Sequence, residues 1–87
     1  MANYHLALTS SAEKELKRLP SRTIQRIASH VENLTSNPRP HGCKKLKGGD
    51  KEWRIRVGEY RVVYTIDDTN LLVEVTRIRH RSTVYGR

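Results

Sequence analysis

The chain has 87 residues, enough for one domain with a modest core, and it carries 17 Lys and Arg against 9 Asp and Glu. The net charge of +8 excludes an acidic surface and favours a polyanionic partner, of which nucleic acid is the commonest. Five basic residues fall in positions 1–38 and twelve in positions 39–87, so the charge gathers in the second half. An evenly solvated basic surface is the alternative interpretation, but this clustering favours nucleic-acid contact.

Cysteine usage and the first residues predict a cytoplasmic protein. Cys43 is the single cysteine, so an internal disulfide cannot form. Neighbouring Lys44 and Lys45 could make its thiol more reactive, although an incidental loop thiol is the simpler interpretation. Residues 1–8 contain neither a charged leader nor a long apolar run, and no stretch approaches the length of a transmembrane span. We therefore expect no signal peptide, no membrane partner and a reducing cytoplasm.

The first half of the chain predicts a strand followed by two helices. Large apolar side chains occupy every second position from Tyr4 to Leu8, which is typical of a half-buried strand. Ser10 can cap a first helix, which ends at Pro20, and Ser21 can cap a second. The apolar residues of the second helix recur at helical spacing: Ile24, Ile27, Ala28, Val31 and Leu34. The proline-rich segment 37–40 ends it.

Residues 51–64 predict two antiparallel strands joined by a two-residue turn at Gly58-Glu59. This turn fixes the register and predicts four facing pairs: Val57 with Tyr60, Arg56 with Arg61, Ile55 with Val62, and Trp53 with Tyr64. Like charges directly opposed destabilise a sheet by a few tenths up to about 1 kcal/mol. Folding gives no reason to place Arg56 across from Arg61, with Arg54 on the same face. An anion bound over that face does.

The remaining residues predict a loop, one long strand and a terminal turn. Residues 37–50 form a basic, glycine-containing loop, residues 67–70 a turn, residues 71–78 the last long strand, and residues 82–87 a short turn. The element order is therefore β-α-α-β-β-β within a single domain, residues 1–87. We expect an α+β fold, in which the N-terminal helical hairpin packs on one face of a small antiparallel sheet.

The last strand contains a conflict that predicts an irregularity. If Ile66 pairs with Leu71 across the preceding turn, strict alternation sends the arginines of this strand into the apolar face. Unpaired arginines cannot occupy a core. A β-bulge within residues 76–80 would turn them outwards, so we expect one there. The side chains concerned are Arg77, Arg79 and Arg81.

The residues that could carry chemistry are cations, one histidine and tyrosines. The chain offers no framed pair of carboxylates, no metal-ligand set and no phosphate-cradling glycine loop. This inventory suits metal-free RNA cleavage, in which the 2′-hydroxyl attacks the adjacent phosphate and arginine forks neutralise the developing charge. His80 or Tyr85 could move protons. The simpler interpretations are solvent-facing strand arginines, an exposed His80 and a Tyr85 that anchors the C-terminal segment.

The chain resembles the RelE/ParE superfamily of prokaryotic type II toxins over nearly its full length. The resemblance rests on Leu46-Lys47-Gly48, on the run from Trp53 to Tyr64, and on the tail from Ile78 to Tyr85. It implies a small antiparallel sheet flanked by two N-terminal helices. The RelE branch, which we favour, implies a ribosome-dependent endoribonuclease acting on mRNA. The ParE branch implies inhibition of DNA gyrase without RNA cleavage.

The resemblance also implies which residues act. By position the catalytic residues are Arg54, Arg56, Arg61, Arg81 and Tyr85, with His80 as a possible proton-transfer group. RNA contacts are expected from Lys44, Lys45, Lys47 and Arg79. The best-known members carry lysines where this chain has Arg54 and Arg56, which weakens the case for a general base on the strands. The implied partners are a RelB-like antitoxin, the ribosome and mRNA, with operator DNA for the toxin–antitoxin complex, and no cofactor or metal.

Overall fold

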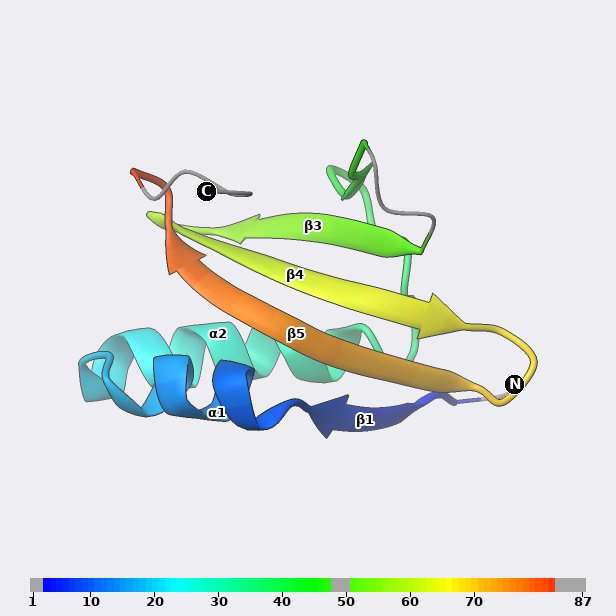
Figure 1. Cartoon of the computed structure of the whole chain (residues 1–87), viewed down its shortest axis with the longest axis horizontal. Helices are drawn as coiled ribbons and strands as arrows, with labels where there is room; N and C mark the ends of the chain where they lie inside the picture. The colour runs from blue at the N-terminus through cyan, green and yellow to red at the C-terminus, as the bar shows by residue number, and fades with distance from the viewer. Residues whose placement is uncertain (1–2, 48–50, 83–87) are drawn as a thin grey trace.

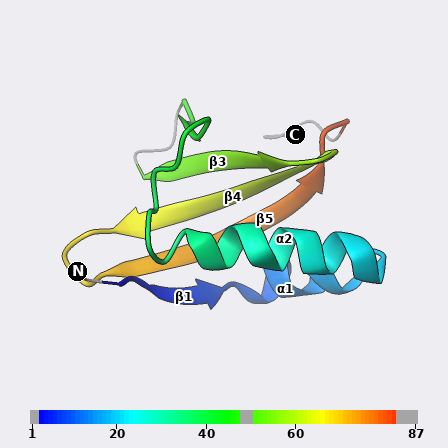
Figure 2. The same ribbon diagram turned by 180° about the vertical axis from the view of Figure 1, so that it is seen from behind.

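The computed structural model describes residues 3–47 and 51–82, which form two helices and five strands. Figure 1 shows both helices on the same side of the sheet, and Figure 2 shows the same arrangement from behind. The elements in chain order are β1 (His5–Leu8), α1 (Ser10–Lys17), α2 (Ser21–Asn33), β2 (Lys44–Lys45), β3 (Glu52–Val57), β4 (Tyr60–Asp67) and β5 (Leu72–His80). The predicted α+β fold is confirmed.

The five strands form one mixed sheet in the order β1-β5-β4-β3-β2. The three long strands make the predicted antiparallel meander, and β1 lies parallel to the first half of β5. The strand β2 is a correction, because residues 37–50 were expected to be a loop throughout. Lys44 pairs with Arg54 and Lys45 with Trp53. A strand of two residues is recognised by its pairing with β3 and not by its own sequence.

Both helices begin one residue earlier than their predicted caps imply. Thr9, and not Ser10, caps α1, because the Thr9 hydroxyl accepts a hydrogen bond from the backbone N–H of Ala12 at 3.2 Å. Pro20, and not Ser21, precedes α2, and no side chain caps that helix. Within the described ranges, neither helix is long and apolar enough to cross a membrane.

The β3–β4 hairpin has the predicted register at every pair, including Arg56 opposite Arg61. Its turn depends on Gly58, whose φ of 60° lies in the left-handed region that the first position of this tight hairpin requires. A Cβ atom added at Gly58 would lie 3.0 Å from the guanidinium of Arg26, so this side chain of α2 packs against the turn. Both constraints fix the hairpin end of the sheet.

The predicted bulge in β5 is confirmed at Thr76. Tyr64 pairs with Val75 and Val63 pairs with Arg77, which leaves Thr76 as the extra residue between them. The expected pairing of Ile66 with Leu71 is wrong, since Ile66 pairs with Val73 after a turn that reaches Leu71 at a φ of 53°. The shift is two residues, so the faces of the strand are unchanged.

The core lies between the two helices and one face of the sheet. Tyr64 is its largest fully buried side chain, and its hydroxyl donates to the carbonyl of Pro38 at 2.7 Å. Burial raises the pKa of Tyr64, so it stays a neutral donor that fixes the loop after α2. The buried residues of this core are Ala12, Ile27, Val31, Leu34, Ile55, Val57, Val62, Tyr64, Ile66, Val73, Val75 and Ile78.

Candidate functional site

The sheet face turned away from the helices, called here the outer face, carries a band of arginines. Cross-strand partners share a face, and Arg61 on β4 pairs with Arg56 on β3 and with Arg79 on β5. Three like charges therefore lie side by side across three strands. One position along, Arg54 pairs with Lys44 and lies on the same face. Because of the bulge, Arg77 pairs with Val63 and also lies on the outer face. This face therefore carries basic residues from four strands.

A small pocket of about 180 Å³ opens at the hairpin end of this face. Arg56, Arg61 and Arg81 reach it from β3, from β4 and from the segment after β5, and Glu59 lines it from the turn. Among the residues that line it, three guanidinium groups meet one carboxylate. Guanidinium forks match pairs of phosphate oxygens, so the composition of this pocket suits a phosphodiester.

Two carboxylates offset part of this charge, and they do so at defined atoms. Glu15 on α1 accepts a hydrogen bond from Arg79 Nε at 2.6 Å and another from the backbone N–H of Ile78 at 2.8 Å. Glu59 Oε2 lies 3.1 Å from Arg81 Nε. Arg79 is thus held by the helix layer beside the edge of β5, whereas the pocket keeps more cations than anions.

His80 lies beside the pocket and does not line it. Its ring packs edge-on against Tyr60 with centroids 5.4 Å apart, and Nδ1 lies 2.8 Å from Ser82 Oγ. Its Nε2 lies 3.7 Å from Glu59 Oε2, the oxygen that also faces Arg81 Nε. Among the residues that line the pocket, Glu59 is thus the one that His80 contacts by its Nε2.

The predicted RNA-binding lysines divide between the two faces of the sheet. Lys44 lies beside Arg54 on the outer face, but Lys45 pairs with Trp53 and shares its opposite face. Lys45 lines a separate pocket of about 300 Å³ at the other end of the sheet, and Lys47 is exposed. Tyr85, the remaining predicted site residue, lies outside the described residues.

The other end of the sheet holds a basic residue in a fully paired arrangement. Arg39 donates two hydrogen bonds to Asp68, at 3.3 and 2.9 Å, and its guanidinium lies 5.2 Å from the ring centroid of Trp53. Tyr4 donates to the same carboxylate at 2.6 Å. Hydrogen bonds from Arg39 and then Tyr4 hold the pKa of Asp68 below its usual value.

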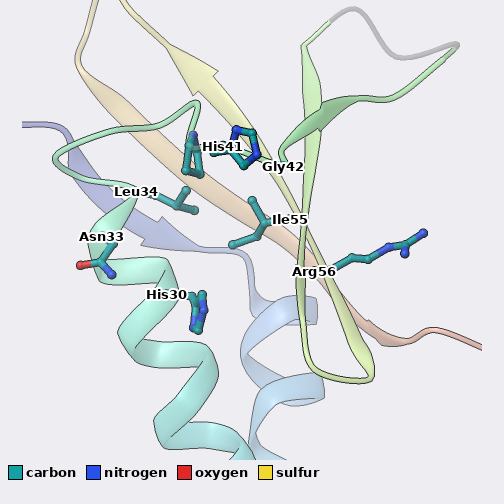
Figure 3. Close-up of a pocket in the computed structure, with 8 residues that line it drawn as sticks. His30, Asn33, Leu34, His41, Gly42, Ile55 and Arg56 are labelled. Carbon is teal, nitrogen blue, oxygen red and sulfur yellow. The ribbon is translucent and has the colours of Figure 1, made fainter.

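A larger cavity of about 440 Å³ lies between α2, the loop after it and β3 (Figure 3). Leu34 and Ile55 form apolar walls, and His30 and His41 stand at its sides. The side chain of Arg56 points away from this cavity in Figure 3, so the cavity is separate from the arginine pocket. Of the predicted site residues, Arg56 is the one that borders it.

Reasoning from the sequence missed Glu59 as a member of the site. The hairpin pattern places it in the turn, and no signal in the sequence brings it to the pocket. The observed β4–β5 register does, because one residue beyond the Tyr60–His80 pair Glu59 lies opposite Arg81, whose backbone N–H donates to the Glu59 carbonyl at 2.7 Å.

Comparisons with known proteins agree with this fold. Residues 6–85 match the family described as the ParE toxin of type II toxin–antitoxin system, parDE. Toxin RelE of Mycobacterium tuberculosis is 38% identical over 84 residues, which cover 94% of this chain and 86% of that protein. Toxin RelG of the same organism is 28% identical over 85 residues, covering 97% and 98%. The solved toxin–antitoxin complex RelBE2 from that organism contains a chain with a TM-score of 0.82, 28% identity and coverage of 95% and 97%.

The fold and the matches over most of the chain define a small type II toxin. The chain belongs to the RelE/ParE superfamily, and its relatives named RelE place it in the RelE branch, which confirms the resemblance stated above.

Proposed function

We propose that this toxin cleaves mRNA on the ribosome without a metal ion. The observation that carries the proposal is the pocket of about 180 Å³ into which three separate segments bring Arg56, Arg61 and Arg81. Such a cluster of like charges is costly in an empty protein and favourable once an anion binds. The outer face beside it, with Arg54 and Lys44, extends the attraction along an RNA backbone.

In this mechanism the RNA supplies its own nucleophile. The 2′-hydroxyl attacks the adjacent phosphate, Arg61 and Arg81 bind the non-bridging oxygens, and Arg56 and Arg54 add positive charge as the transition state gains negative charge. Tyr85 positions a nucleotide. Outside the pocket, ribosomal RNA is contacted by Lys44, Lys45, Lys47 and Arg79.

The partner of the toxin is an antitoxin of the RelB kind. The RelBE2 structure contains a toxin with its antitoxin, and a chain of net charge +8 offers an acidic antitoxin segment a complementary surface. The antitoxin neutralises the toxin by covering the outer face. We place both proteins in the cytoplasm, where ribosomes and mRNA are found.

Inhibition of DNA gyrase is the second candidate function. The family description that matches residues 6–85 names the ParE toxin, and this observation favours it. A gyrase inhibitor needs a surface for a protein partner and has no use for a pocket sized for a phosphate. The two candidates therefore predict different results. A ribonuclease should lose its mRNA cleavage and its toxicity when Arg81 is neutralised, whereas a gyrase inhibitor cleaves no mRNA in the first place.

Primer extension on a translated mRNA tests the proposal. Purified wild-type toxin should cut the message at codon positions when ribosomes are present and should leave free mRNA intact. Arg81→Ala should remove the cuts, whereas Arg22→Ala, an exposed arginine on α2, should retain them. Intact mRNA combined with DNA-damage signalling in expressing cells would assign the toxin to gyrase.

A further inference from the structure

The proposed reaction needs a group that accepts the proton of the 2′-hydroxyl, and the arginines cannot supply it. Arginine holds its proton above pH 12, so Arg54, Arg56, Arg61 and Arg81 remain cations throughout. Within the described part of the pocket lining, Glu59 is the carboxylate present. We propose that Glu59 is the general base of this toxin, an inference that rests on the ribonuclease function proposed above.

The turn holds Glu59 by its backbone and by one side-chain oxygen. Its carbonyl accepts from the backbone N–H of Arg81 at 2.7 Å, and Oε2 lies between Arg81 Nε at 3.1 Å and His80 Nε2 at 3.7 Å. Oε1 makes no hydrogen bond or ion pair with the residues that the structure describes. One oxygen anchors the carboxylate, and we assign the other, which has no partner among the described residues, to the hydroxyl.

The same contacts place the base next to the phosphate. Arg81 is shared, because its Nε faces Glu59 while the rest of its fork is available to the scissile phosphate. The 2′-hydroxyl is attached to the sugar beside that phosphate, so a phosphate bound by Arg81 brings its hydroxyl towards Glu59. A general base must reach the proton it removes, and this arrangement meets that requirement.

The step balances as a transesterification. Glu59 Oε1 takes the proton of the 2′-hydroxyl, and the freed electron pair forms the bond from the 2′-oxygen to phosphorus. The bond from phosphorus to the 5′-oxygen breaks, and that oxygen takes a proton from water. The hydroxide left behind recovers the proton from Glu59. The products are a 2′,3′-cyclic phosphate and a 5′-hydroxyl end, and the protein is unchanged.

Among the described residues, the charged groups that contact Glu59 or line the pocket with it are all basic. Arg81 and His80 come from the end of β5, and Arg56 and Arg61 come from the hairpin strands. Arg26 reaches the adjacent Gly58 from α2. The four guanidinium groups attract both the carboxylate and the phosphate, so the two anions can share the pocket.

Single-turnover cleavage on ribosomes carrying an mRNA tests the proposal. Glu59→Gln keeps an oxygen that can accept from Arg81 but cannot take a proton at neutral pH, so cleavage should slow about 100-fold or more. Glu59→Asp, which retains the carboxylate on a shorter side chain, should recover part of that loss. Glu13→Gln is the matched control, because Glu13 is an exposed, ion-paired glutamate on α1 and should cut at the wild-type rate.

Binding separates catalysis from the positioning of Arg81. The same ribosomes carrying an mRNA with a 2′-deoxy nucleotide at the cut site bind the toxin without being cleaved. Glu59→Gln should bind them at least as tightly as the wild type, because it removes a negative charge beside the phosphate.

Equal losses of binding and cleavage in Glu59→Gln would assign Glu59 to holding Arg81 and overturn the proposal, as would cleavage at the wild-type rate. A wild-type toxin that does not cut at all would overturn the ribonuclease function itself, whatever Glu59 does.

Discussion

The two ends of β4 use arginine in opposite ways. Directly after the last residue of β4, the Asp68 carboxylate accepts two hydrogen bonds from Arg39. The guanidinium of Arg39 also covers the ring of Trp53. At its first residues, Arg61 lies between Arg56 and Arg79 in one cross-strand row. Figure 1 shows these ends at opposite sides of the sheet. The same side chain pairs with a carboxylate at one end and lies in a row of like charges at the other.

This difference teaches how to separate stabilising from functional arginines in a small basic protein. A guanidinium with a carboxylate and an aromatic ring has its donors satisfied by the fold, so removing it should cost stability. A guanidinium opposed by others gains most when an external anion arrives, so removing it should cost binding and catalysis. Net charge alone does not distinguish the two.

Arg61→Met should have the largest effect on activity. It keeps an aliphatic stem on the sheet and removes the charge, so mRNA cleavage on ribosomes should fall about 100-fold or more. The free energy of unfolding should fall less than in the Arg39→Met variant, since repulsion from Arg56 and Arg79 disappears with the charge. Primer extension and urea titration measure the two effects on one preparation.

Arg39→Met is the matched control and should show the reverse. Cleavage should persist at the wild-type rate, while the melting temperature should fall because the Asp68 hydrogen bonds and a cation–π contact worth about 0.5–1 kcal/mol are lost. If Arg39→Met cut poorly and Arg61→Met only unfolded more easily, the comparison between the two ends would be wrong.

Glu15→Ala removes the carboxylate partner of Arg79 and should cause the largest loss of folding stability among these variants. The partly buried carboxylate accepts from both Ile78 and Arg79, and hydrogen bonds to a charged group contribute about 1.5–3 kcal/mol. Its removal also leaves the free edge of β5 unpaired beyond β1. Urea unfolding should show a loss of about 2 kcal/mol.

Glu13→Ala on the same helix serves as the comparison for that measurement. Glu13 forms an exposed pair with Lys17 four residues on, and such pairs contribute only about 0.3–0.5 kcal/mol. Equal losses in the two variants would show that Glu15 has no special role at the edge of the sheet.

The smallest expected effect is a loss of folding stability in acid, which comes from Asp68 at the far end of β4. The folded state holds the pKa of Asp68 below its unfolded value, so the ionised carboxylate contributes stability at neutral pH that is lost as pH falls through the folded pKa. Asp68→Asn should melt below the wild type at pH 7. The gap should narrow below about pH 4, where thermal melts in a pH series would follow it. A constant gap would exclude the ionised carboxylate as its source.

The hairpin could be predicted from the sequence because its geometry is local. A two-residue turn at Gly58-Glu59 leaves one register, and that register alone places Arg56 opposite Arg61. The bulge could also be predicted, since without it arginines would enter the core. The sequence places the bulge within the five residues 76–80 but does not identify Thr76 as the extra residue.

Contacts between distant segments could not be predicted. Glu15 meets Arg79 across 64 positions of the chain, and β2 exists only because two lysines lie alongside β3. Ser10 and Thr9 offer the same hydroxyl, and Thr9 becomes the cap because its backbone N–H donates to Val75 on β5 and so stays outside the helix. Tertiary structure decides each of these.

The extra residue at Thr76 also sets the curvature that closes the arginine pocket. A bulge bends its strand, and β5 curves towards the hairpin end in Figure 1 before Arg81 meets Glu59. Deleting Thr76 would leave every other side chain of β5 on its present face while straightening the strand. Such a shortened chain would keep its full complement of charges yet hold Arg81 at a different spacing from Arg61. The deletion therefore separates the shape of this strand from its composition, which no substitution can do.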